Sequence, residues 1–214
     1  MGGAEMGGTG AEGAEAEKGV RIRRAGPDDR AAVVRILDEG FQYDPVSGWV
    51  FPDEARRREV HHLLMAAFFE LALAEGHVDI TEDESAAALW IDVPADAGES
   101  DEEGPAQLRA FVDPDNERIE QIARFTAAIH PHGRAHAYLM MIAATPQRQG
   151  EGLGSALIDP VLQECDRVGR PAYLEASSER SPRLYERLGF APLGEPLRLP
   201  DGPPMYPMWR EPRV

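Results

Sequence analysis

The chain has 214 residues, a length that fits one domain with a hydrophobic core of useful size. Its net charge of −16 argues against nucleic acid and anionic membrane surfaces as partners, and it favours cationic small molecules or basic peptides. The single cysteine, the absence of an apolar run long enough to span a membrane and the absence of a secretory signal predict a cytoplasmic protein without disulfides or a cysteine-based metal site.

The N-terminal part of the chain divides into a tail and the start of a folded domain. Residues 1–18 are mostly Gly, Ala and Glu, which predicts a disordered tail, and residues 19–214 are expected to form a single domain. Lys18 is the only lysine beside 21 arginines, a bias that suggests a GC-rich bacterial genome. The alternation in 20–23 predicts a first strand, and Pro27 opens a helix.

Residues 41–53 concentrate aromatic rings together with carboxylates, and we expect them to form a loop. In one interpretation the rings pin the loop into the core. In the other, the rings and a carboxylate form a pocket wall that receives an ammonium group. The candidate substrate-binding residues are Phe41, Tyr43, Asp44 and Trp49.

The middle of the chain predicts a long helix, two strands and further helices. His61 and His62 are interpreted as surface or packing residues, because adjacent residues on a helix do not share a face. The turn around Pro131 contains closely spaced histidines, but with no cysteine or acidic third ligand nearby we expect no metal there. The expected elements are a helix at 54–75, strands at 77–80 and 86–93, and one or two helices at 109–129.

The most informative stretch is 145–156, T-P-Q-R-Q-G-E-G-L-G-S-A, between an apolar run at 137–144 and an amphipathic run. This order predicts a strand, a glycine-rich turn and a helix start. Gly150, Gly152 and Gly154 remove three side chains, so that backbone N–H groups can approach an anion at the positive end of the helix. The expected ligand is a phosphate or pyrophosphate.

Three phosphate-binding motifs compete for this stretch, besides a turn that binds nothing. A P-loop needs a lysine, which is absent. A dinucleotide fingerprint comes close, with Glu175 at the distance of a ribose contact, but five residues separate the strand from the first glycine. The third motif is Q-x-x-G-x-G, present as Gln149, Gly152 and Gly154.

The C-terminal part predicts a core strand at 172–176 and a short helix at 182–188 with Ser181 as its N-cap. Residues 190–199 and 205–210 are expected to close the fold as a strand pair. The resulting order of strands and helices predicts an α/β fold with a mixed sheet.

Two ordered markers resemble the GNAT superfamily of N-acetyltransferases. The first is the Q-x-x-G-x-G loop, and the second is L-E-A-S-x-x-x-S-x-x-x-Y-x-x-x-G-F at 174–190. The run 137–212 is particularly similar to puromycin N-acetyltransferase and its actinobacterial relatives. The resemblance implies a mixed central sheet with splayed central strands, flanked by helices, and acetyl-CoA as co-substrate.

The resemblance also implies which residues hold acetyl-CoA. Ser181 stands where many relatives have Asn, and Glu151 stands where a basic residue is common, so both could weaken binding. The implied cofactor-binding residues are Ile142, Ala143, Ala144, Gln149, Gly150, Glu151, Gly152, Leu153, Gly154, Ser155 and Ser181.

The implied reaction moves an acetyl group to a primary amine of a small cationic acceptor by direct attack. A base must first deprotonate the alkylammonium, whose pKa is near ~10. Glu175, a carboxylate in an apolar strand, and Tyr138 are the candidates for this base. By its position in the second marker, Tyr185 is the candidate acid that protonates the leaving thiolate, while Asp44 holds the cationic acceptor.

Two alternatives remain beside this small-molecule enzyme, which we expect to be a monomer or homodimer. One is a protein acetyltransferase that acts on lysines or N-termini. The other is a catalytically degenerate acyl-CoA-binding module with an interaction role.

Overall fold

The computed structural model describes residues 19–96, 103–178 and 182–213. The expected tail at 1–18 and the expected N-cap Ser181 lie outside these residues. No helix in the described part of the chain is long and apolar enough to cross a membrane. The helices are α1 (Arg30–Phe41), α2 (Pro45–Val50), α3 (Glu54–Glu75), α4 (Gly104–Val112), α5 (Glu117–Ile129), α6 (Leu153–Val168) and α7 (Pro182–Arg187).

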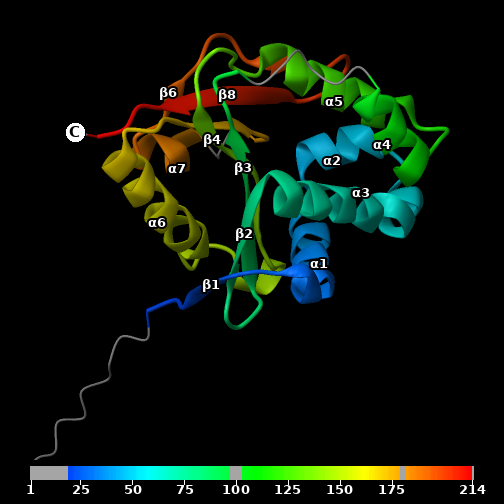
Figure 1. Ribbon diagram of the computed structural model, residues 1–214. Coiled ribbons are helices and arrows are strands. Elements are labelled where there is room, and N and C mark those ends of the chain that lie inside the picture. The colour runs from blue at the N-terminus through cyan, green and yellow to red at the C-terminus, as the bar shows by residue number, and fades with distance from the viewer. Residues whose placement is uncertain (1–18, 97–102, 179–181, 214) are drawn as a thin grey trace, which may run out of the picture.

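The strands form one twisted sheet in the order β1-β2-β3-β4-β5-β8-β6, with β7 paired to β8 (Figure 1). The pairing of β4 with β5 is parallel, and every other pairing of described strands is antiparallel. The strands are β1 (Ile22–Arg24), β2 (Gly76–Thr81), β3 (Ala86–Val93), β4 (His136–Ala144), β5 (Ala172–Ala176), β6 (Ala191–Pro192), β7 (Leu197–Arg198) and β8 (Pro204–Arg210).

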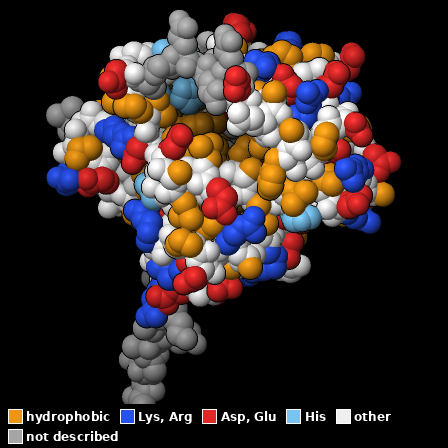
Figure 2. Space-filling view, turned by 45° about the vertical axis from the view of Figure 1, so that its right-hand side comes forward, with side chains coloured by type: hydrophobic (Ala, Val, Ile, Leu, Met, Phe, Trp, Pro, Cys, Tyr) orange, Lys and Arg blue, Asp and Glu red, His pale blue; other side chains and the backbone are white. Residues whose placement is uncertain are grey.

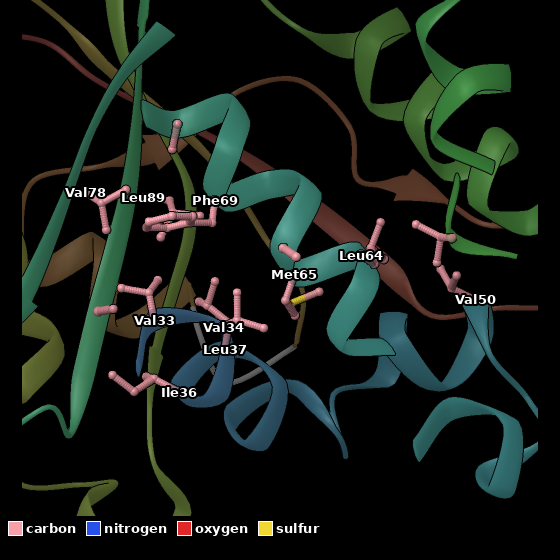
Figure 3. Packing of buried hydrophobic residues seen from close by; sticks show 14 of the residues in the cluster. Val33, Val34, Ile36, Leu37, Val50, Leu64, Met65, Phe69, Val78 and Leu89 are labelled. Carbon is pink, nitrogen blue, oxygen red and sulfur yellow. The ribbon is translucent and has the colours of Figure 1, made fainter. Parts of the chain in front are cut away.

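Helices cover both faces of the sheet, and each face has its own hydrophobic core. On one face, Leu64, Met65 and Phe69 of α3 pack with Val33 and Leu37 of α1 against β2 and β3 (Figure 3). On the other face, α6 and α7 pack against the sheet through buried side chains. The members from these two helices are Leu153, Leu157, Ile158, Leu162, Cys165 and Tyr185. The expected mixed α/β architecture with flanking helices is confirmed.

Strand β4 contains a bulge. Leu89 of β3 pairs with Met141, whereas the next residue, Trp90, pairs with Leu139, so that Met140 is an extra residue. Met140 and Met141 both pack into the core beneath α1 and α3, although successive strand residues normally face opposite sides. The bulge therefore shifts the alternation of β4 by one residue just before its C-terminal end.

The central strands separate after two residue pairs. Ala137 pairs with Ala172 and Tyr138 pairs with Tyr173, and no pair follows. Each strand remains fixed on its outer side, because β4 pairs with β3 up to Ala144 and β5 pairs with β8 along its whole length. The expected splaying of the central strands is therefore present, between β4 from Leu139 onward and β5 from Leu174 onward.

Two sequence-based expectations need correction. The loop expected at 41–53 contains the helix α2, which begins at a proline behind the N-cap Asp44 and is too short to show a helical period. The closing strand expected at 190–199 is two strands of two residues each, β6 and β7. Glycine and proline at 194 and 196 interrupt the run between them.

Candidate active site

The glycine-rich stretch connects the end of β4 to the start of α6. Gly150 and Gly152 have φ angles of +83° and +82°, which favour glycine. Gly152 is the N-cap of α6, and no side chain caps this helix end. The first N–H groups of a helix of 16 residues are therefore left for an anion.

The glycine-rich loop lies against the separated part of β4. A Cβ on Gly154 would lie 3.8 Å from the Ile142 Cδ1 atom, and Gln149 Nε2 donates to the Ala144 carbonyl at 3.3 Å. Leu153 is buried in the core beneath α6, and Ser155 is half-buried beside it. Most of the predicted cofactor residues therefore lie together, between the helix start and the strand gap.

The unfavourable charge expected from Glu151 has a local partner. Its Oε2 atom accepts from Arg148 Nε at 2.7 Å, and the same guanidinium reaches Asp83 in the turn between β2 and β3. Glu151 is exposed, so the ion pair is screened by solvent. The carboxylate therefore pairs with Arg148 beside the helix end.

Backbone groups of β4 face the gap at alternate residues. The Thr145 N–H donates to Ser85 O at 2.8 Å, which places the amide of residue 145 on the β3 side. Because strand amides alternate, Ala143 also faces β3, whereas Ile142 and Ala144 face the gap. The hydrogen bond from Gln149 Nε2 to Ala144 O agrees with this alternation, because the carbonyl of residue 144 also faces away from β3. Two of the three predicted strand residues can thus present N–H groups to a ligand, while Ala143 cannot.

Glu175 is a buried carboxyl group beside the gap. Its side chain is 3% exposed, and Oε1 has no hydrogen-bond partner among the described residues. Burial raises its pKa to about 7, while the hydroxyls of Tyr138 and Tyr173 oppose the rise. Burial and the Glu175 charge raise the pKa of Tyr138 well above its usual value, so its hydroxyl is protonated at neutral pH.

Tyr185 lies on the α6 side of β5, and Asp44, the N-cap of α2, is near enough for its charge to act on Tyr185. Tyr185 is buried, packs edge-on against Phe190, and has a pKa raised to about 12 by burial and by the Asp44 charge. Asp44 Oδ2 accepts from Ser177 Oγ at 2.6 Å, and Oδ1 caps α2 by accepting from the Val46 N–H at 2.8 Å. Burial also raises the pKa of Asp44.

The four predicted substrate residues do not form one pocket wall. Trp49 is buried, donates from Nε1 to Pro200 O at 2.7 Å and carries the Arg118 guanidinium over its ring. Phe41 packs partly buried against the core, whereas Tyr43 is 77% exposed. The rings at 41 and 49 thus follow the core-pinning interpretation, whereas the Asp44 charge acts on the candidate residue Tyr185.

A cleft of about 730 Å³ lies beside Trp49, between α2, the turn that joins α4 to α5, and the turn that precedes β8. Asp44, Tyr138, Glu175 and Tyr185 do not line it. Figure 2 shows acidic and basic side chains interspersed over the visible face, with hydrophobic side chains inside a central hollow. The cleft is therefore a feature separate from the group of candidate catalytic residues.

Sequence reasoning missed three residues of this site. His130 was considered only as a metal ligand, and within the described residues no group of three or more His, Cys, Asp or Glu side chains is arranged to hold a metal ion. Tyr173 lies on the same face of β5 as Glu175, two residues away, so strand alternation could have revealed it. Ser177, which binds Asp44, belongs to the second sequence marker, but the marker does not assign it a role.

A split mixed sheet, with a glycine-rich helix start on one side and buried carboxyl and hydroxyl groups around the split, is the architecture of the acetyltransferase class that binds acyl-coenzyme A. A model described as the acetyltransferase (GNAT) family matches residues 57–190. The chain belongs to this family, as its two sequence markers predict.

Individual relatives agree with this assignment. The chain is 28% identical over 185 residues to a mycothiol acetyltransferase of Mycolicibacterium paratuberculosis, covering 80% of this chain and 46% of the relative. It is 38% identical over 53 residues to an uncharacterised N-acetyltransferase of Schizosaccharomyces pombe, covering 25% and 22%. The chain thus spans less than half the length of these curated relatives.

Solved structures match over nearly the whole chain. A histone acetyltransferase HPA2 and related acetyltransferase from Corynebacterium glutamicum has a TM-score of 0.69 at 26% identity, covering 92% of this chain and 98% of that one. Arylalkylamine N-acetyltransferase 2 from Aedes aegypti has a TM-score of 0.64 at 14% identity, covering 90% and 98%, which shows the shared fold.

We predict that Gly154→Val weakens acetyl-CoA binding by at least roughly tenfold while the protein stays folded, because the new side chain occupies the approach to the α6 N–H groups. The backbone itself tolerates the change, since only Ile142 lies near the new Cβ. Calorimetric titration measures the affinity. Gln163→Val, at an exposed position of the same helix, is the control, and equal affinity of Gly154→Val and wild type would refute the assignment.

We predict that Glu175→Gln raises the melting temperature at pH 8 and has little effect near pH 4. The folded-state pKa of about 7 exceeds the ordinary 4.5, so the folded protein binds the extra proton and loses stability as pH rises between these values. At about 1.4 kcal/mol per pKa unit, the glutamine removes a penalty of up to about 3 kcal/mol. Glu186→Gln, at an exposed carboxylate, controls for the charge change. A variant that is less stable than wild type at pH 8 would contradict the burial argument.

Proposed function

We propose that this chain transfers the acetyl group of acetyl-CoA to a primary amine of a small cationic acceptor by direct attack. The observation that carries the proposal is the buried, unpaired carboxyl oxygen of Glu175 beside the split between β4 and β5. A carboxylate in this position can take a proton from an amine that enters the split.

The two faces of the sheet support separate entry routes for the two substrates. Tyr138 packs with the core beneath α1 and α3, and Tyr173 and Glu175 occupy alternate positions beside it. The glycine loop, α6 and Tyr185 lie on the opposite face. The acceptor would thus approach from the α1 face and acetyl-CoA from the α6 face, and the two would meet in the split.

Acetyl-CoA supplies the acetyl group as a thioester. The uncapped start of α6 is suited to its pyrophosphate, and the N–H groups of Ile142 and Ala144 are suited to a carbonyl oxygen that gains negative charge. These donors are held by the β3 pairing of β4, so they need no reorganisation when charge develops.

Glu175 is the better-supported base. With a pKa of about 7 it is ionised in a large fraction of molecules at neutral pH and still accepts a proton readily. Tyr138 keeps its proton, because its pKa lies well above the usual value. We therefore assign Tyr138 to orienting Glu175 rather than to deprotonating the amine.

Tyr185 is proposed as the acid that protonates the leaving thiolate. A pKa of about 12 keeps its hydroxyl protonated at neutral pH, and it lies on the same face as α6. Asp44 is near enough to raise that pKa and can attract a cationic acceptor. Its hydrogen bonds with Ser177 and the start of α2 hold the carboxylate in place.

The net charge of the chain and its sequence resemblance guide the choice of acceptor. A net charge of −16 favours a cationic acceptor, and the resemblance of 137–212 to puromycin N-acetyltransferase, inferred from the sequence alone, favours a small one, such as a puromycin-like nucleoside, an aminoglycoside or a polyamine. A protein acceptor is the second candidate, because the structurally similar Corynebacterium glutamicum protein carries the name of a histone acetyltransferase.

The proposal is tested by measuring thiol release from acetyl-CoA with a panel of acceptors. The panel contains puromycin, kanamycin, spermidine, a lysine-rich peptide and the neutral amide of each amine as a control. We expect turnover with a small cationic amine, and a rate that rises with pH through about 7 as Glu175 ionises. Turnover with the peptide alone would favour a protein acceptor, and tight acetyl-CoA binding without any turnover would favour a binding module.

We predict that Tyr185→Phe lowers the single-turnover rate of acetyl transfer by roughly 10²-fold with little change in acetyl-CoA affinity. The ring and its contact with Phe190 remain, and only the hydroxyl is lost. The rates are compared at saturating acetyl-CoA with matched folded fractions. Equal rates for variant and wild type would remove Tyr185 from the mechanism.

A further inference from the structure

A line of polar contacts leads from Glu175 to the turn that precedes β4. His130 Nδ1 faces the unpaired Oε1 atom of Glu175 at 3.9 Å. On its other side His130 Nε2 lies 3.1 Å from His136 Nε2, and His136 Nδ1 lies 2.8 Å from the Arg134 carbonyl oxygen. The ring of His130 also packs edge-on against Tyr138 and Tyr173, with centroids 4.8 and 4.9 Å away.

These contacts fix the tautomer of each ring. A carbonyl oxygen only accepts, so His136 carries its proton on Nδ1 and has a bare Nε2. His130 must then donate from Nε2, because two bare nitrogens would repel each other at 3.1 Å. In the neutral ring this leaves Nδ1 of His130 bare, and it is this lone pair that faces Glu175.

We propose that His130 is the proton exit of this site: it accepts at Nδ1 the proton that Glu175 removes from the acceptor and releases it to solvent, and His136 is the positioning residue that holds His130 in the required tautomer. This inference rests on the proposed function, in which Glu175 is the base.

The proton transfer balances without any further reactant. An N–H bond of the acceptor's ammonium breaks and an O–H bond forms on Glu175. That O–H bond then breaks as the N–H bond forms on His130 Nδ1, which gives an imidazolium and restores the carboxylate. The proton then leaves to solvent from the imidazolium, because the His130 side chain is 18% exposed whereas that of Glu175 is 3% exposed.

The surroundings keep the imidazolium short-lived. Burial and the neighbouring rings of His136 and His132 lower the pKa of His130 to about 4, so His130 does not retain the proton. His136 is likewise held neutral, because burial and the nearby Arg170 and Arg134 lower its pKa. The titratable groups that face His130 are Glu175, Tyr138, Tyr173, His136 and His132.

The tautomers can be observed without any substrate. Long-range ¹⁵N–¹H correlation spectra of the wild-type protein at pH 7 should show both rings neutral, with a bare Nδ1 in His130 and a bare Nε2 in His136. Single histidine-to-glutamine variants assign the signals. A proton on Nδ1 and none on Nε2 of His130 would overturn the proposal.

Chemical rescue tests the transport of the proton. In weak buffer, His130→Ala should lower turnover by at least roughly tenfold with little change in KM, and added imidazole should restore it in a saturable way. A purely structural loss would not be restored by imidazole. His62→Ala, at an exposed position of α3 outside the relay, should keep wild-type turnover with no response to imidazole.

The outcomes separate the relay from the base. Loss of turnover in Glu175→Gln together with wild-type rates of His130→Ala in weak buffer would overturn the relay alone. Full activity of Glu175→Gln, or a wild type that acetylates no amine in the panel, would overturn the proposed base and the relay with it. His136→Ala removes the group that holds the His130 tautomer. This variant should lose less turnover than His130→Ala, and imidazole should restore part of the loss. Wild-type turnover of His136→Ala would rule out a positioning role for His136.

Discussion

The separation of β4 from β5 is the constraint on which the rest of the structure depends. The two parallel strands share only the pairs at Ala137 and Tyr138, although each continues for several residues. Backbone N–H and C=O groups that lose a strand partner need another one, so an open split inside a sheet is costly unless water or a ligand fills it. Here the β3 and β8 pairings hold the edges of the split apart and make it a permanent feature.

Several local features decide which backbone groups of β4 face the split and hold the end of that strand in place. The bulge at Met140 turns Ile142 and Ala144 toward the split. Gly40 lets α1 approach the same strand, since a Cβ there would lie 2.7 Å from Ala143 Cβ and 3.2 Å from Ala144 O. The helix α1, the bulge and the glycine loop thus fix one end of β4 from three directions, and the proposed oxyanion donors gain their rigidity from this packing.

The chemistry follows from what the split encloses. A carboxyl group that is almost fully buried and has a free oxygen costs stability whenever it is ionised. The fold retains this cost at Glu175 and surrounds the group with tyrosine hydroxyls and a histidine lone pair. On the other face burial raises the pKa of Tyr185 as well, to about 12. One physical effect, desolvation, thus raises the pKa of both the proposed base and the proposed acid.

The sequence by itself determined most of the elements and the place of the glycine-rich turn, to which we assign phosphate binding. Periodicity placed α3 at 54–75, and the glycine spacing located the turn before α6, because both signals depend on neighbouring residues. It also marked Glu175, since a charge in an apolar strand is conspicuous. It did not show that α2 interrupts the loop at 41–53, because six residues are too few for a period.

Only the tertiary structure decided which groups meet. The register of β4 with β5 brings Tyr138 beside Tyr173 and Glu175, and the turn before β4 brings His130 over them. It likewise separates Trp49, which is pinned under Pro200, from Asp44, which reaches Ser177. Burial and long-range register set these contacts and the pKa values that follow, and neither is a property of neighbouring residues.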